Sequence, residues 1–217
     1  MIRFIRKRLS RSILIVLAVC VALVIGAGDY LRVSREIKDR IEMITLFGKE
    51  FAASIYTGIK YPMFTGDSDG VKKQLLGIRE KTKDDVEVFI CDSDQEIIFA
   101  THEDKIKTNV RDSIYNKAAV QTLNEALKTG IDPQKAFEED VMGKRYLITM
   151  QPVLNQAACF RCHDSSRKVL GSIIVKMSTD RIYSTIISNR NRSIIISILG
   201  IGIIILLTYA MLTRLVS

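Results

Sequence analysis

The sequence predicts an α+β fold, in which one antiparallel sheet follows a long helix and is flanked by two transmembrane helices. Three observations predict this fold. Uncharged apolar runs lie near both ends of the 217-residue chain. Apolar residues at helical spacing follow the first run, and farther along the chain the apolar period changes to two, which is typical of strands joined by turns.

The two uncharged runs have the length of membrane spans. The first covers Ser12–Gly28, 17 residues, and the second covers Ser193–Thr213, 21 residues. At about 1.5 Å per residue, these helices reach roughly 25 Å and 31 Å, against a hydrocarbon core of about 30 Å. We therefore expect transmembrane helices over residues 12–31 and 193–213. A cleaved signal peptide is the alternative for the first run, and a buried core helix is the alternative for the second.

The excess of basic residues lies at the two ends of the chain. Lys plus Arg number 32 and Asp plus Glu number 24, a net charge of +8. Six of these cations flank the apolar runs: Arg3, Arg6, Lys7, Arg8, Arg11 and Arg214. Residues 29–192 then hold 26 basic and 24 acidic residues, a net charge of +2. The charge therefore gives no reason to expect a nucleic-acid partner.

The basic N-terminus also predicts the topology. Cations before the first span keep residues 1–11 in the cytoplasm. Residues 32–192 then form an exported domain, and residues 214–217 form a cytoplasmic stub after the second span. We expect a membrane protein whose central domain lies outside the cytoplasm.

The exported domain begins with a helix that continues the first span. Its apolar stripe consists of Ile37, Ile41, Ile44, Phe51 and Ile55. Pro62 and Gly66 predict that this helix breaks there. Ser68 or Asp69 is placed to cap a second helix over residues 68–81.

A sheet follows these helices. Apolar residues on alternate positions predict strands over residues 86–90, 97–100, 136–142, 146–150 and 171–177. The cluster Asp92-Ser93-Asp94 turns the chain between the first two strands. A helix over 113–128 separates the second strand from the third, and a terminal helix over 179–192 leads into the second span.

The sharpest chemical signal is the sequence Cys159-Phe160-Arg161-Cys162-His163. C-x-x-C-H is the attachment motif of c-type haem. Cys159 and Cys162 can form thioethers to the two vinyl groups of one porphyrin, and His163 can bind the iron from the proximal side. Attachment takes place outside the cytoplasm, which agrees with the export that the charges predict. We expect one covalent haem c.

Other uses of the two thiols stay open. A zinc site needs two more ligands, which would come from Cys91, His102 or carboxylates. A thioredoxin-like dithiol or a structural disulfide is possible outside the cytoplasm, but neither uses His163. We expect Cys91, alone in a strand, to be an inert core thiol.

The sixth iron ligand is less clearly indicated. The candidates are Met63, His102, Met142, Met150 and Met177. Met150 and Met177 lie on apolar strand faces, where methionine is usually core filler. His102 lies beside Glu103 and Asp104, in an expected solvated turn. Met63 lies in the unusually apolar helix break, so we choose Met63, with an open or water-bound site as its main rival.

A resemblance joins these motifs. Within Met150–Thr179 the pattern P-V-x-N-x-x-x-C-x-x-C-H is followed by V-L-G and a strand, and earlier segments read Y-P-M-F-T-G-D and F-I-C-D-S-D-Q-E-I-I. The sequence resembles the haem-c-containing periplasmic PAS-like or Cache-like sensor domains of bacterial chemoreceptors and sensor histidine kinases. The resemblance implies a PAS/Cache-like fold, a homodimer, and a distal methionine from the helical segment of either chain. Met63 is the matching position.

In such receptors the second span leads into a HAMP linker and a cytoplasmic output module. The sequence given ends at Ser217, where a HAMP helix would begin. Both an N-terminal part of a longer receptor and a stand-alone membrane cytochrome are therefore open.

Three functions are compatible with these residues. The leading one is a membrane-bound c-type haem sensor of redox state or of a small gaseous ligand. The second is a membrane-anchored monohaem electron carrier that serves a redox partner, and the third is a Cache-type receptor for an organic ligand. We do not expect an enzyme, because no catalytic constellation is visible and kinase activity would need an output domain.

Overall fold

The computed structural model describes residues 2–83 and 85–216 of the chain. The chain divides into two compact units. One is formed by Ile41–Arg181, and the other by Met1–Arg40 together with Ile182–Ser217. The first unit combines helices with one antiparallel sheet, so the predicted α+β class is confirmed.

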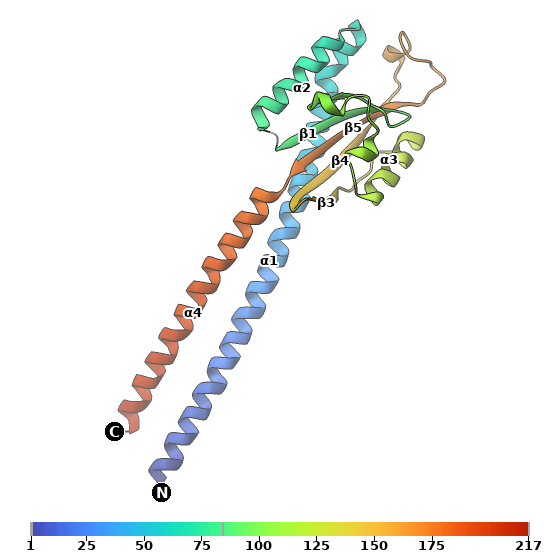
Figure 1. Cartoon of the computed structure of the whole chain (residues 1–217). Helices are drawn as coiled ribbons and strands as arrows, with labels where there is room; N and C mark the ends of the chain where they lie inside the picture. Colours follow the sequence, from blue (N-terminus) through green and yellow to red (C-terminus); the bar gives the residue numbers. More distant parts are fainter. Residues whose placement is uncertain (1, 84, 217) are drawn as a thin grey trace. The chain divides into compact units, whose positions relative to one another are not determined.

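The second unit is helical. It is formed by the first part of α1 (Ile2–Thr65) and by most of α4 (Asp180–Val216), with both chain ends at the same end of the unit (Figure 1). Ser193 Oγ donates a hydrogen bond to Asp29 Oδ1 at 3.3 Å, which joins the two helices. Among the described residues, one helical segment is long and apolar enough to cross a membrane: Asp180–Met211, which contains an 18-residue stretch with a mean hydropathy of 2.6. It contains most of the predicted second span, whereas the first span stays a prediction.

The sheet has five strands in the order β2-β1-β5-β4-β3 (Figure 1). Their bounds are β1 Val86–Asp92, β2 Ile97–Ala100, β3 Phe137–Val141, β4 Lys144–Leu154 and β5 Val169–Ser178. All neighbours are antiparallel, and β5 pairs along its length with both β1 and β4. The five predicted strands are therefore confirmed, each within a few residues of its expected position.

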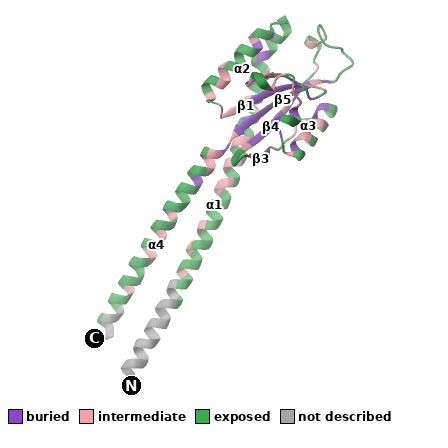
Figure 2. Cartoon of the chain, viewed as in Figure 1, coloured by how far each residue is buried: buried purple, intermediate pink, exposed green. Residues whose placement is uncertain are grey.

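Both faces of the sheet are covered, and its strands are the most buried part of the molecule (Figure 2). Ile173, Val175 and Met177 of β5 point to a core shared with α1 and α2 (Ser68–Thr82). Ile174 points to the opposite core, which is closed by α3 (Lys117–Thr129). Because successive side chains of a strand alternate between faces, the nearly continuous burial of β5 shows that this strand is buried on both sides.

Two boundaries differ from the sequence prediction for local reasons. The helix expected from residue 113 begins at Lys117, because the Asn116 side chain caps it by accepting from the N–H groups of Ala118 and Ala119. Strand β4 continues through Pro152, where the prediction ended it. Pairing with β3 stops at Ile148, so Pro152 lies at a free edge of β4 and its missing N–H disrupts no ladder.

The predicted helix break at Pro62 is wrong, because α1 continues through Pro62 to Thr65 and ends at Gly66, where φ is +75°. Proline removes the hydrogen bond that the carbonyl of Gly58 would accept. Gln74 of α2 replaces it, since its Nε2 donates to Gly58 O at 3.0 Å. The cap of α2 is Asp67, whose side chain accepts from Gly70 N, and not Ser68 or Asp69.

Helix α1 lies very close to the sheet at Gly48. A Cβ at this position would lie 2.7 Å from both Thr149 Oγ1 of β4 and Met177 Cε of β5. Real Cβ atoms do not approach other heavy atoms so closely, so any larger residue would force the Thr149 and Met177 side chains, or the helix itself, to shift. Glycine at position 48 therefore sets how near α1 comes to the sheet.

A buried ion pair fixes the loop before α3 to the sheet. Lys176 Nζ of β5 lies 2.5 Å from Glu139 Oε1 of β3, with side chains only 5% and 4% exposed. The same ammonium donates to Ser113 O at 3.1 Å, and Glu139 Oε2 accepts from the N–H groups of Tyr115 and Asn116. Hydrogen bonds to both partners offset part of the cost of burying the two charges.

Replacing Lys176 by Met should destabilise the domain by about 3–5 kcal/mol, because Glu139 is then a buried carboxylate without its counter-charge. Urea unfolding of the purified chain, followed by circular dichroism, measures this loss. The matched control is Lys72→Met, which removes an exposed ion pair with Asp69 and should cost about 1 kcal/mol or less. Equal losses for the two variants would contradict the prediction.

Candidate functional site

The C-x-x-C-H motif lies on the loop of residues 155–168, which joins β4 to β5. The loop leads into β5 at one end of the strand, and α4 begins after the other end. It is drawn in tan in Figure 1. It contains one short helical turn, η3 (Ala157–Cys159). The N–H groups of Cys162 and His163 both donate to Cys159 O, at 3.1 and 3.0 Å, so the motif is folded as a tight turn.

The second half of the loop is tied down by side chains. Ser166 donates to Asp164 through both its N–H, at 2.9 Å, and its hydroxyl, at 2.8 Å. These hydrogen bonds lower the pKa of the Asp164 carboxyl below its usual range. Asn155 Nδ2 donates to the carbonyls of Asp164 and Arg167, both at 2.8 Å, and so closes the base of the loop.

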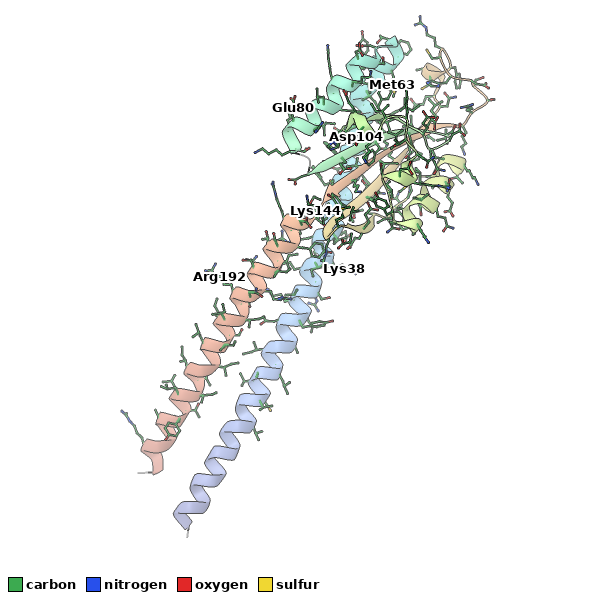
Figure 3. The ribbon with its side chains drawn as sticks, in the orientation of Figure 1. Lys38, Met63, Glu80, Asp104, Lys144 and Arg192 are labelled. Atoms are coloured by element: carbon green, nitrogen blue, oxygen red, sulfur yellow. The ribbon has the colours of Figure 1, made fainter. Side chains whose placement is uncertain are left out.

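The end of α1 faces this loop. Tyr56, Lys60 and Met63 follow one another at spacings of four and three residues, and so lie on one side of the helix. Met63 lies in the last turn of α1, near the start of α2 (Figure 3). The prediction that Met63 lies in a loop is therefore wrong. Met63 projects from a helix, with 38% of the residue exposed.

A cavity of about 350 Å³ lies between the end of α1, the loop and the adjoining ends of β4 and β5. All four residues chosen from the sequence line it: Met63, Cys159, Cys162 and His163. The other lining residues are Tyr56, Thr57, Lys60, Tyr61, Phe64, Val153, Ala158, Arg161 and Leu170. The fold thus brings the C-x-x-C-H motif and Met63 to one mostly apolar site.

Two cations and a phenol add polarity to the cavity. Lys60 Nζ donates to Gln156 Oε1 at 3.2 Å, and Arg161 lies 5.9 Å from the centre of the Phe64 ring. Both contacts join α1 to the cysteine loop. Burial, with a smaller contribution from the charge of Cys159, raises the pKa of the Tyr56 phenol. Tyr56 therefore stays protonated at neutral pH and offers a hydrogen-bond donor.

The donor set of the cavity fits a c-type haem. Cys159 and Cys162 are free thiols, and Cys162 and His163 are exposed enough to react or to bind a metal. Apolar walls suit a porphyrin ring, and the cations suit its two carboxylates. In the described part of the chain, no group of three or more His, Cys, Asp or Glu side chains is arranged around a common metal position.

The other candidate ligands do not line the cavity. Met150 and Met177 are only 2% and 4% exposed, one in each core. Met142 is fully exposed in the turn between β3 and β4, and His102 precedes the short helix η1 (Glu103–Lys105). Cys91 is buried in β1, and burial raises the pKa of its thiol to about 12, as expected of an unreactive core thiol.

Sequence reasoning missed the residues that complete the cavity from α1. Tyr56, Lys60 and Phe64 are spaced with Met63 along one helix, and this periodicity was the available signal. This spacing identifies cavity residues only once the cysteine loop is known to lie against that helix.

Two solved structures show a distant likeness to this chain. The sensor domain of the histidine kinase DctB from V. cholerae has a TM-score of 0.43 and 13% identity, over 71% of this chain and 55% of that chain. A domain of an HTR-like protein from Haloarcula marismortui ATCC 43049 has a TM-score of 0.29 and 16% identity, over 43% of this chain and 96% of that one.

A family model gives the clearer result. The model of the methyl-accepting chemotaxis sensory transducer, class 40H, sensor, matches residues 53–180. This match begins within α1, includes the whole sheet and the cysteine loop, and ends at the first residue of α4. Family and candidate span together indicate a membrane-associated protein for signal transduction. The chain belongs to the family of class 40H sensor domains of methyl-accepting chemotaxis transducers.

Proposed function

We propose that this chain is a periplasmic haem-c sensor, which detects redox state or a small gaseous ligand and signals across the inner membrane. The observation that carries the proposal is the cavity shared by Cys159, Cys162, His163 and Met63. Two thiols, an imidazole and a thioether are the donors of a covalently bound haem with two axial ligands. When bound, the haem supplies an iron that changes oxidation state and binds small gases.

The cavity residues that carry donor groups or charge have distinct roles in this proposal. Cys159 and Cys162 anchor the porphyrin through thioethers, and His163 is the proximal ligand. Met63 is the distal ligand, and a thioether favours the ferrous state. Lys60 and Arg161 are the cations available to the haem carboxylates, with Tyr56 as a nearby donor.

The signalling route follows from where these residues lie. Met63 belongs to α1, whereas Cys159, Cys162 and His163 belong to the loop that leads through β5 into α4. A haem held by all four residues would tie α1 to this loop, so Met63 is the residue whose hold on the haem would change how α1 sits against the loop. The two helices concerned are those expected to cross the membrane.

A homodimer and a cytoplasmic output module complete the proposal. Met43, Leu46 and Phe47 form an exposed apolar strip on α1, with 69%, 59% and 56% of each residue accessible. A second copy of the same strip would cover these side chains. The output module would follow α4 in a longer chain.

An electron carrier is the second candidate function. Cys162 and His163 are exposed, so a haem held there would present an edge at the surface. An exposed edge favours electron exchange with a docking partner. Rapid oxidation by a soluble cytochrome, without any change in the helices, would support this function over sensing.

Covalent attachment tests the cofactor itself. The chain expressed with a cytochrome c maturation system should gain the mass of one haem, and Cys159→Ala together with Cys162→Ala should abolish that gain, since no thioether can form. Mass spectrometry of the intact, denatured chain measures it. Cys91→Ala is the control and should keep the haem, because Cys91 is buried outside the cavity. A wild-type chain without added mass contradicts the proposed function.

The distal ligand is tested by Met63→Ala. The oxidised variant should lose the charge-transfer absorption of a thioether–iron bond and become high-spin, because no other methionine lines the cavity. Optical spectra of the oxidised and reduced chain show the change. Met43→Ala is the matched control on the same helix, since Met43 lies outside the cavity. An unchanged Met63→Ala spectrum would exclude this ligand.

Signal transfer is tested by the spacing of the two helices. Spin labels at Lys38→Cys of α1 and Arg192→Cys of α4, in a chain with Cys20→Ser and Cys91→Ala, occupy exposed positions (Figure 3). Pulsed electron resonance should give different distance distributions for the oxidised, reduced and nitric-oxide-bound forms. The same distribution in all three forms would rule out the mechanism.

A further inference from the structure

Asn155 holds the loop that carries the motif. Its N–H donates to Lys168 O at 3.0 Å, and its Nδ2 donates to Asp164 O and to Arg167 O, each at 2.8 Å. One side chain therefore uses both of its amide hydrogens on the backbone of the returning half of the loop. Asp164, whose carbonyl accepts one of these amide hydrogens, directly follows His163 in the chain.

The amide oxygen of Asn155 is unused. Oδ1 is buried and, among the residues that the structure describes, has no hydrogen-bond partner. A buried acceptor without a donor costs about 1–3 kcal/mol. Such an atom beside a binding loop is explained when a donor reaches it in the loaded state.

A metal-bound histidine supplies such a donor. The ring nitrogen that does not bind the metal almost always donates its hydrogen to an acceptor, which fixes the tautomer and the ring orientation. His163 is exposed in the structure, so its ring has room to turn into the cavity that it lines. Asp164 and Ser166 are themselves joined by hydrogen bonds, which leaves Asn155 Oδ1 as an unpaired buried acceptor of this loop.

We propose that Asn155 is the positioning residue of His163, a role that rests on the proposed haem function. Its amide nitrogen fixes the backbone that follows His163. Its amide oxygen accepts the hydrogen bond of the His163 ring nitrogen that faces away from the iron. Asn155 thereby sets both the direction and the basicity of the proximal ligand.

Nitric oxide provides a test that is specific to this role. Bound to ferrous haem, nitric oxide weakens the bond to the histidine on the opposite side, so the balance between retained and released His163 reports the strength of that bond. Asn155→Leu removes both amide hydrogens and the acceptor with little change in size. It should shift this balance about tenfold toward release, as outer-sphere substitutions do for metal ligands.

The measurement uses the full-length, haem-loaded chain in detergent, with optical and electron resonance spectra of its ferrous nitric-oxide form. Asn155→Asp is a second variant, which loses both donors but keeps a stronger acceptor. It should keep His163 bound at least as well as the wild-type chain does, because a carboxylate accepts the ring hydrogen and raises the basicity of the ligand. Asn109→Asp is the control, because it makes the same chemical change where only the acceptor oxygen is used by Arg111 N. It should leave the balance unchanged.

The outcomes separate this role from the proposed function. If the wild-type chain carries no covalent haem, the proposed function fails and the inference with it. If the wild-type chain carries haem and Asn155→Leu keeps the wild-type balance, Asn155 only closes the loop and the inference is overturned. If Asn155→Leu does not fold, Asn155→Asp decides: release of His163 in this variant, which loses only the bonds that close the loop, overturns the inference, and retention of His163 supports it.

Discussion

The pairing of β5 along both of its edges is the constraint on which the rest of the domain depends. This strand joins the cysteine loop at one end to α4 at the other, and β1 and β4 bond to it along almost its whole length. Ten residues at about 3.3 Å each separate the two ends by roughly 30 Å. Each buried backbone hydrogen bond that is left unmade costs about 1–3 kcal/mol, so β5 does not stretch or slip easily. A displacement of the loop would therefore move the sheet as one rigid unit, or would move the helices that pack against the sheet, before it reached α4.

The cavity depends on this arrangement because no single segment builds it. The loop supplies thiols and an imidazole, and the last turns of α1 supply a thioether, an amine and a phenol. Lys60 and Gln156, which are in hydrogen-bond contact, lie 96 positions apart in the chain. The buried pair of Lys176 and Glu139 fixes the loop before α3, on the opposite face of the sheet. One face is thus tied down by charge, while the face that carries α1 is held mainly by apolar contacts.

Sequence reasoning succeeded where the signal is local. Alternating apolar residues locate all five strands. The haem chemistry that C-x-x-C-H predicts stays a prediction. Sequence reasoning failed where a residue far away in the sequence changes the structure that the local residues alone would favour. Pro62 stays inside α1 because Gln74, from another helix, takes over the carbonyl of Gly58. Met63 was chosen as the distal ligand because a loop was expected around it. It lines the cavity but lies in a helix, and its role as a ligand stays a prediction. The contribution of Tyr56 and Lys60 depends on which face of α1 meets the loop, and this is a property of the tertiary fold.

The close approach at Gly48 makes the contact between α1 and the sheet sensitive to a single methyl group. A side chain at this position would begin only 2.7 Å from atoms of Thr149 and Met177. Alanine would therefore displace these two side chains or the helix, and would alter the packing of α1 against both β4 and β5. Residue 48 thus offers a way to change how α1 is seated on the sheet without touching any residue that lines the cavity.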